Sequence, residues 1–151
     1  MRNLRLIFTG IFTLLFVACS QEPAKIHYGS DECTHCKMMI TDPQFASQLV
    51  TDKGKAYTFD SIECLAAYSR EKGGDLQEAK LWVNNYANPG EWLNAIQAQY
   101  VKSEDIQSPM GESLLALPSA EAAEKHTTDK PGQLIKWKEV KQLKMEMNMN
   151  L

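Results

Sequence analysis

The chain has 151 residues, of which 44% are hydrophobic and 23% charged, and its formal net charge is −3 at pH 7. A chain of this length has room for one compact domain or two very small ones. The mild acidity and the lack of a basic patch in the sequence argue against nucleic acid as a partner.

Residues 1–18 have the pattern of an export signal. Two arginines form a basic start, and Leu6 to Val17 is an apolar run too short to cross a bilayer comfortably. The run ends in Phe-Val-Ala-Cys, which resembles a bacterial lipobox, where the cysteine is lipidated and becomes the mature N-terminus. We therefore expect a lipoprotein signal peptide over 1–18, lipidation of Cys19, and a polar tether over 19–30. The alternative is a signal peptide with an incidental cysteine.

The segment 31–87 is expected to form a β-β-α-β unit. Residues 45–60 read as two short strands, joined by a turn in which Gly54 supplies a positive φ. A helix should follow, because Asp60 and Glu63 have the spacing of a capping box and two glycines at 73–74 can end it. The residues 79–87 read as the third strand.

The segment 99–140 repeats this order. Strands are expected over 99–103 and 112–118, a short helix over 119–126, and a last strand over 133–140. The connector 88–98 contains a Pro-Gly breaker followed by one possible amphipathic helical turn that includes Trp92, Leu93 and Ile96. The tail 141–151 carries three alternating methionines and should fray.

The two halves match best at Phe59–Glu63 and Leu117–Glu121, so the repeat is architectural. Each half alone could bury only a thin apolar face. We therefore predict an α+β protein in which two small related β-β-α-β halves pack together.

The segment Cys-Thr-His-Cys-Lys-Met over 33–38 carries the candidate chemistry. Haem attachment needs a histidine where Lys37 stands, so that reading fails. A thiol-disulfide oxidoreductase suits an oxidising compartment, but such a site would follow a β-α-β unit and begin a helix. Zinc could use Cys33 and Cys36, yet no second ligand pair has finger-like spacing. A structural disulfide is a further alternative.

Copper(I) is a further candidate, since this soft ion prefers thiolate and thioether sulfur. Met38 stands two residues after Cys36, and in an extended segment this spacing puts both side chains on the same side. Met39 and Ile40 are expected to begin a buried strand.

The remaining candidates have structural interpretations. With Cys19 lipidated, three cysteines are left, and an odd number cannot close entirely into internal disulfides. Cys64 is expected to be a small buried core residue, with a ligand role left open. His126 is expected to favour the negative end of its helix, again with a ligand role left open. No nucleophile, base and orienting group occur together, so the chain should not be an enzyme.

Several of these features together resemble the NosL family of copper chaperones, which act in the assembly of nitrous oxide reductase. They are the lipobox, the Cys-x-x-Cys-Lys-Met segment, the segment FDSIECL at 59–65 and the later Pro-Met-Gly with Met110. The likeness extends from about Glu32 to Val140, and Lys37 replaces a glycine that is often found there.

The resemblance implies a copper(I) chaperone that is lipid-anchored to a bacterial membrane and faces the periplasm. Its partner would be nitrous oxide reductase or the assembly complex of that enzyme. Carried over by position, the copper ligands would be Cys36 and Met38 first, then Cys33 and Met110. Zinc is a secondary candidate metal.

Overall fold

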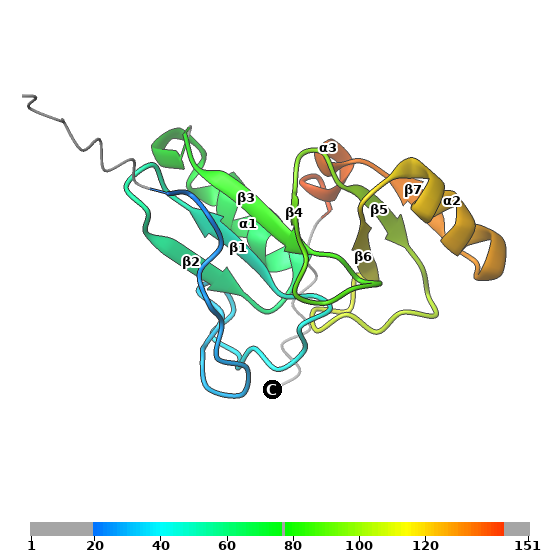
Figure 1. Cartoon of the computed structure of the whole chain (residues 1–151), viewed down its shortest axis with the longest axis horizontal. Coiled ribbons are helices and arrows are strands. Elements are labelled where there is room, and N and C mark those ends of the chain that lie inside the picture. The colour runs from blue at the N-terminus through cyan, green and yellow to red at the C-terminus, as the bar shows by residue number, and fades with distance from the viewer. Residues whose placement is uncertain (1–19, 77, 144–151) are drawn as a thin grey trace, which may run out of the picture.

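The computed structural model describes residues 20–76 and 78–143, and its two antiparallel sheets lie next to each other (Figure 1). The first sheet has the order β2-β1-β3-β4, and the second has the order β6-β5-β7. The strands are β1 (Ser47–Val50), β2 (Ala56–Phe59), β3 (Lys80–Asn84), β4 (Trp92–Asn94), β5 (Gln99–Lys102), β6 (Leu114–Leu117) and β7 (Gln133–Ile135). The helices are α1 (Ile62–Glu71), α2 (Ala120–Asp129) and α3 (Trp137–Val140), with a 3-10 turn at Gly73–Leu76.

The two halves share one topology. In each half the first strand lies in the middle, with the second strand on one side and the third on the other. Ser47 of β1 is paired with Phe59 and Val83, and Tyr100 of β5 is paired in the same way with Ala116 and Ile135. The predicted α+β fold of two related halves is therefore confirmed.

The helices of the two halves begin in the same manner. Ser61 and Ser119 are the N-caps, with φ/ψ of −149°/162° and −148°/161°, and each hydroxyl accepts a hydrogen bond from the amide three residues later. The capping box predicted for Asp60 and Glu63 is wrong, because the serine between them takes the cap position. Both carboxylates are buried instead and make other contacts.

Two elements differ from the prediction. The connector forms a strand, β4, rather than a helical turn, because a tight turn with Gly90 at φ +101° folds the chain back beside β3. Ile96 consequently lies 64% exposed. The predicted last strand stops at Ile135, since the Glu139 carboxylate accepts the Lys136 amide at 2.8 Å and starts the short helix α3.

The second sheet is buried on both faces, which explains why β6 reads Leu-Leu-Ala-Leu. Alternate residues point to opposite sides of a strand. Tyr100 and Leu114 join the main core shared with the first half, whereas Val101 and Leu115 pack beneath α2 with Ala123. The second sheet therefore lies between the first half and α2 (Figure 1).

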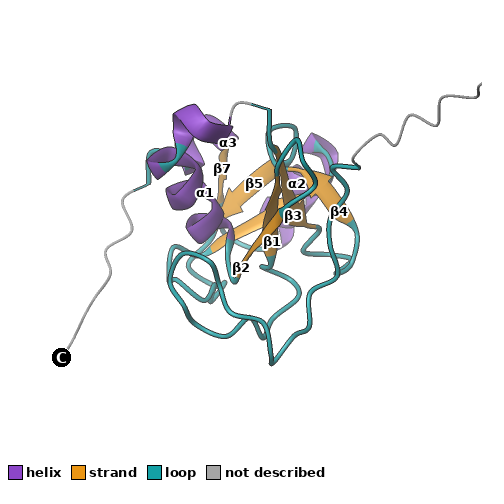
Figure 2. Ribbon diagram, turned by 90° about the vertical axis from the view of Figure 1, so that its left-hand side faces the viewer, coloured by secondary structure: helices purple, strands orange, loops and turns teal. Residues whose placement is uncertain are grey.

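Helices α1 and α3 lie side by side (Figure 2), which brings the end of the described chain against the first half. The Arg70 guanidinium donates hydrogen bonds to the carbonyl oxygens of Lys141 and Leu143, the latter at 3.3 Å. Trp137 and Val140, three residues apart on α3, are both buried in the main core. The three tail methionines at 145, 147 and 149 fall outside the described residues.

The segment after Ser20 is held against the outer face of the first sheet. The Trp82 indole donates to the Gln21 carbonyl at 2.9 Å, and the Gln48 amide both donates to and accepts from the Ala24 backbone, at 2.7 and 2.9 Å. Ile26 is 6% exposed and belongs to the main core. The tether predicted for 19–30 is thus fixed to the domain at Gln21, Ala24 and Ile26. Cys19 and the predicted signal peptide fall outside the described residues.

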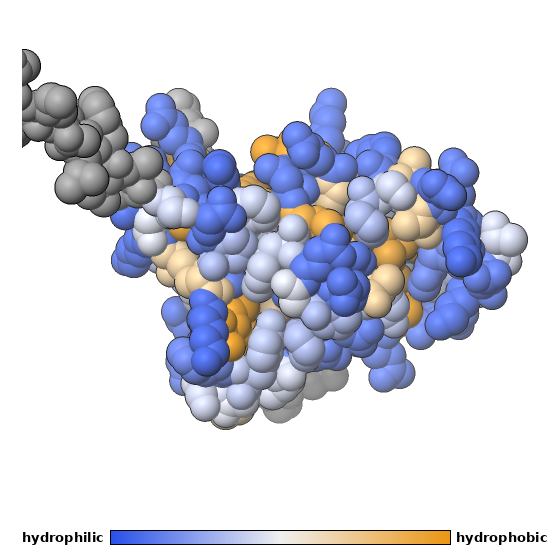
Figure 3. All heavy atoms as spheres, viewed as in Figure 1, coloured by the Kyte–Doolittle hydropathy of each residue, from blue (hydrophilic) through white to orange (hydrophobic). Residues whose placement is uncertain are grey.

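Among the described residues, no helix has both the length and the apolar character needed to cross a membrane. The face of the molecule in Figure 3 is mostly hydrophilic, with its hydrophobic residues in small separate patches. On this face, the described part of the chain offers no broad apolar area of the kind that marks a large protein interface.

Candidate metal site

The cysteine segment forms the tip of a small hairpin that lies beside β2. The Lys37 amide donates to the Cys33 carbonyl at 3.0 Å, and the Cys33 amide donates to the Met38 carbonyl at 2.8 Å. Lys37 has a φ of +66°, in the left-handed region that glycine tolerates best. The Thr34 amide donates to the Thr58 carbonyl of β2 at 2.8 Å, which fixes the hairpin tip against the first sheet.

Four side chains from three elements meet beneath this tip. They are Cys33 and Cys36 of the hairpin, Asp60 directly after β2, and Cys64 in the first turn of α1. The three sulfur atoms and one Asp60 carboxylate oxygen all lie within 4.8 Å of one another. Cys33 and Cys64 are fully buried, Asp60 is 3% exposed, and Cys36 is half-buried. We refer to these four residues as the thiol cluster.

The thiol cluster is built by local features of the sequence. Ser61 caps α1 through its hydroxyl, which accepts the Cys64 amide at 3.2 Å. This cap places Cys64 in the first turn, on the side that faces the cluster, with Asp60 just before the helix. The three cysteines that the structure describes are all free.

The three thiols are not equivalent. The pKa of Cys33 is lowered to about 7, mainly because the Cys64 thiol donates a hydrogen bond to it, with help from the backbone amides of Asp60 and Cys36. Burial raises the pKa of Cys36 to about 12. The pKa of Cys64 is also raised, because its proton is held in the hydrogen bond to Cys33 and because it is buried. Cys33 is therefore the thiol that ionises first.

Asp60 gives the cluster an acceptor that is only partly used. Its Oδ2 accepts a hydrogen bond from the Cys36 thiol at 3.4 Å. Its Oδ1 is buried and has no hydrogen-bond partner among the described residues. A buried carboxylate oxygen without a partner is costly, and a cation bound beside it would remove that cost. The cluster thus has the composition and the charge of a site for a soft metal ion.

The methionines predicted as ligands differ in burial. Met38, next to Cys36, is 45% exposed. Met110 lies in the loop between β5 and β6, half-buried, and packs against the same main core as Cys36. Roles for Met38 and Met110 as ligands remain predictions. Met39 is 53% exposed, so its predicted place in a buried strand is wrong, whereas Ile40 is fully buried as expected.

The histidines lie apart from the thiol cluster. His27 faces Asp31 at 3.4 Å, and His35 faces Glu71 at 3.8 Å. His126 packs edge-on against Tyr86 with ring centroids 6.1 Å apart. None of the three belongs to the group of ligand atoms described above.

The sequence prediction missed Asp60 and the position of Cys64 in the cluster. Asp60 was interpreted as part of a helix cap, and Cys64 as a core residue with a ligand role left open. A signal was present, because the odd number of cysteines required at least one thiol to stay free or bind something. The spacing of Cys64 from Ser61 places that thiol in the first helical turn.

The oxidoreductase alternative does not suit this geometry. A catalytic thiol of that class is partly exposed and lies at a helix N-terminus that favours the thiolate. Here the first cysteine of the pair, Cys33, is fully buried, and the pair occupies a hairpin tip. The sulfur-rich cluster under the hairpin is instead a group of side chains that could hold a metal ion.

Comparison with known proteins identifies the family. The family model described as NosL matches residues 23–145, and the chain belongs to this family. It is 28% identical over 131 residues to the copper-binding lipoprotein NosL of Stutzerimonas stutzeri, covering 82% of this chain and 68% of that protein.

A solved structure has the same fold. The crystal structure of the copper chaperone NosL from Shewanella denitrificans superposes with a TM-score of 0.63 at 21% identity, over 80% of this chain and 96% of that one. Both relatives are named for copper binding or copper chaperoning and not as enzymes. This agrees with the expectation that the present chain is not an enzyme.

Proposed function

We propose that this protein is an extracytoplasmic, lipid-anchored copper(I) chaperone that delivers copper to nitrous oxide reductase while the copper centres of that enzyme are assembled. The observation that carries the proposal is the thiol cluster, in which three sulfur atoms and a carboxylate lie within 4.8 Å of one another. Membership of the NosL family and the copper-related names of its relatives support the choice of metal.

The sulfur-rich composition favours the monovalent ion. Copper(I) binds thiolate and thioether sulfur in preference to oxygen, whereas zinc binds both. Cys33 and Cys36 are the predicted thiolates, and Met38 and Met110 are the predicted thioethers. Thioethers do not form disulfides, so they suit a copper site outside the reducing cytosol.

The partial exposure of the site supports transfer rather than storage. Cys36 is half-buried and Met38 is 45% exposed, so an incoming donor group from another protein can reach the ion before the outgoing ligand leaves. A completely enclosed ion would have to wait for the fold to open. In this proposal, copper passes to the reductase by stepwise ligand exchange at the hairpin tip.

Lipidation at Cys19 would hold the protein at the periplasmic side of a bacterial membrane. The similarity to a protein named as a lipoprotein supports this part of the proposal. Because Gln21 already accepts a hydrogen bond from Trp82, little free chain would separate the lipid from the domain. The copper site would then operate close to the membrane surface.

Anaerobic titration of the thiol-reduced protein with copper(I), in competition with a chromogenic chelator, tests the proposal. We expect one copper per chain, lost in Cys36→Ser without loss of the far-ultraviolet circular dichroism spectrum. Copper-loaded protein should then activate copper-free nitrous oxide reductase faster than the same concentration of copper-chelator complex. Failure of the wild-type protein to bind copper(I), or transfer no faster than from the chelator, would contradict the proposal.

Mass spectrometry of the membrane fraction tests the anchor separately. The wild-type chain should carry acyl groups on Cys19, and Cys19→Ala should carry none. Acylation that persists in this variant would show that the lipobox assignment is wrong.

A further inference from the structure

A groove with a volume of about 690 Å³ lies where α1, α3 and the start of β3 meet. Helices α1 and α3 are side by side at this place (Figure 2). Much of the lining is apolar and includes Leu76 before β3, Leu81 within it and Ile96 after β4. Ile96 is 64% exposed, so the groove presents apolar surface at the outside of the molecule.

The charged side chains that line the groove are all cationic. They are those of Arg70, Lys138 and Lys141, and none of the described residues that line the groove is acidic. All three are exposed, and no ion pair among the described residues involves them. The chain as a whole carries a formal charge of −3, so this is a local excess of positive charge beside apolar surface. Such a surface matches a partner that is both anionic and amphiphilic.

The residue expected to carry the lipid enters the domain beside this groove. The Gln21 side-chain amide donates to the Glu78 carbonyl at 2.5 Å, and Glu78 directly precedes Ala79, which lines the groove. Only Ser20 separates Cys19 from Gln21, so Cys19 lies within about 7 Å of a residue that is fixed next to the groove. Acyl chains on Cys19 would therefore hold the groove at the surface of the bilayer.

We propose that the groove is a docking surface for the anionic phospholipid headgroups of the bilayer into which the lipid anchor is inserted. Lys138 and Lys141 contact the headgroup phosphates, and Ile96 lies in the interfacial layer beside them. The inference rests on lipidation of Cys19 in the proposed function and does not depend on the bound metal. A lipid alone leaves a domain free to rotate on the membrane, whereas a second contact gives it one orientation.

This orientation directs the thiol cluster away from the bilayer. Ser20 lies against the turn between β1 and β2, since its carbonyl oxygen is 3.5 Å from the place that a Cβ on Gly54 would take. Asp60 of the cluster follows the opposite end of β2, whose four residues span about 13 Å. The copper site thus remains near the membrane but opens away from it, where a periplasmic partner can reach the hairpin tip.

Hydrogen–deuterium exchange of the acylated full-length chain tests this surface. The protein is placed on vesicles of phosphatidylcholine, with or without phosphatidylglycerol. We expect amides in 69–81 and 137–142 to exchange more slowly, by at least about threefold, only when phosphatidylglycerol is present. High salt should remove this protection, because it screens charges at a surface. Exchange in 33–38 and in α2 should be the same on both kinds of vesicle.

Charge variants identify the residues that make the contact. Lys138→Gln, Lys141→Gln should lose the protection, since each cationic residue near an anionic surface contributes about fivefold to binding. Lys125→Gln, Lys130→Gln is the matched control, because it removes the same charge from exposed positions on α2 and its C-cap, across the second sheet from the groove. This control should keep the protection. Both variants change exposed side chains and should fold normally.

Three results would overturn the inference. They are equal protection on both kinds of vesicle, equal loss of protection in the two charge variants, and the same protection in detergent without phospholipid. The last result would mean that a second copy or another part of the chain covers the groove. Mass spectrometry of the same samples separates this inference from the proposed anchor. A chain without acyl groups would contradict the anchor, whereas an acylated chain without protection would contradict the docking surface alone.

Discussion

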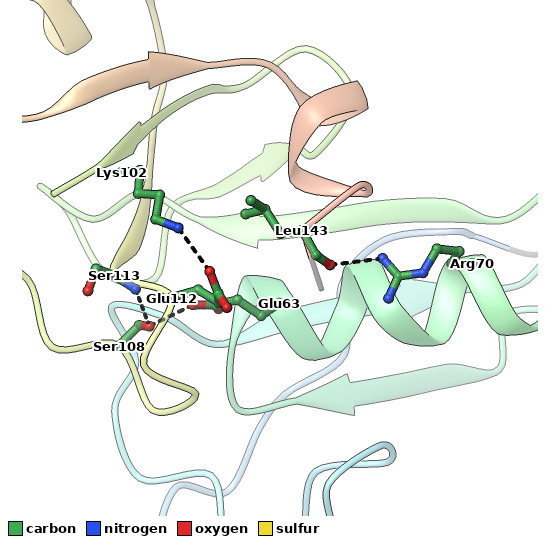
Figure 4. Close-up of polar contacts among 7 residues, drawn as sticks. All are labelled: Glu63, Arg70, Lys102, Ser108, Glu112, Ser113 and Leu143. Carbon is green, nitrogen blue, oxygen red and sulfur yellow. Dashed lines mark hydrogen bonds and ion pairs between the residues drawn. The ribbon is translucent and has the colours of Figure 1, made fainter. Parts of the chain in front are cut away.

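The Ser108 hydroxyl donates a hydrogen bond of 2.6 Å to Oε1 of Glu63, and this contact joins the loop between β5 and β6 to the first turn of α1 (Figure 4). Ser108 in turn accepts the Ser113 amide at 3.0 Å, which closes the loop on itself. The loop carries Met110, and the helical turn carries Cys64. A buried hydrogen bond between the two halves therefore sets the position of Met110 relative to the thiol cluster.

Removing the Ser108 hydroxyl should destabilise the fold. In Ser108→Ala, both the Glu63 carboxylate and the Ser113 amide lose a partner in a buried place, so the free energy of unfolding should fall by about 1–3 kcal/mol. Chemical denaturation of the two proteins measures this difference. Ser69→Ala is the control, since its hydroxyl bonds only the Ala66 carbonyl of its own helix in a part-buried place, and its effect should stay within about 0.5 kcal/mol. Equal effects of the two substitutions would show that the contact between the halves contributes little.

Because Glu63 is buried, the stability of the fold should depend on pH. Desolvation raises the pKa of this carboxyl above its usual 4.5. The folded state therefore retains a proton that the unfolded state loses, and the associated stability declines as the pH rises from 4.5 through the folded-state pKa. Glu63→Gln keeps an acceptor for Ser108 and does not ionise. The stability of this variant relative to wild type should increase from about pH 5 to about pH 8, as measured by thermal melts. A difference that is independent of pH would contradict this account.

Lys37 is a site where a glycine should stabilise the protein. Its φ of +66° costs an L-residue about 1–2 kcal/mol, and glycine avoids this cost at an entropic expense of about 0.5–1 kcal/mol. The only described contact of its side chain is a hydrogen bond from Nζ to the Thr34 carbonyl at 2.8 Å, in an exposed place. Lys37→Gly should therefore raise the free energy of unfolding by up to about 1 kcal/mol. Lys37→Ala removes the same ammonium but keeps the strain, and should give no increase. If both variants behave alike, the left-handed turn is not a source of strain.

The features that were predicted correctly depend on residues close together in the sequence. Ser61 and Ser119 each precede a helix by one residue, and the repeat was recognised because these positions match. Gly54, at φ +78°, marks the turn between β1 and β2 at the predicted place. Periodicity and turn residues suffice for such elements.

The thiol cluster depends on contacts between distant segments, and for this reason the sequence did not reveal its full composition. Thr34 is bonded to Thr58, and this contact brings the hairpin over Asp60 and Cys64. Met39 was misplaced for a local reason. The left-handed turn at Lys37 changes which side chains of the second hairpin strand point toward the core. The first fully buried side chain after the turn is therefore Ile40 and not Met39. The short elements β4 and α3 likewise depend on packing against β3 and the main core.

Copper affinity should increase with pH. Near neutral pH the Cys36 thiol keeps its proton, because burial raises the pKa of Cys36 to about 12. Copper(I) binds thiolates, so this proton must leave on binding, which contributes about a tenfold gain in affinity per pH unit. Cys33 has a pKa of about 7, so above that pH it is already ionised and adds little to the pH dependence of copper affinity. Competition titrations between about pH 7.5 and 9, corrected for the chelator, measure the slope. An affinity that does not change over this range would exclude the Cys36 thiol as a ligand.

Met38 should act on the rate of copper transfer as well as on copper affinity. It is 45% exposed beside Cys36, where its thioether can take the ion as the Cys36 thiolate releases it. Met38→Leu conserves volume, so stability should change by less than about 1.5 kcal/mol, while transfer to an apo acceptor should slow by about tenfold. Met39→Leu is the matched control, because Met39 is 53% exposed, directly adjacent in the chain, and paired across the hairpin with Glu32. Stopped-flow transfer and equilibrium competition on the same samples separate rate from affinity. A Met38→Leu variant that binds copper weakly yet releases it at the wild-type rate would make Met38 a resting ligand, and the exchange role would be wrong.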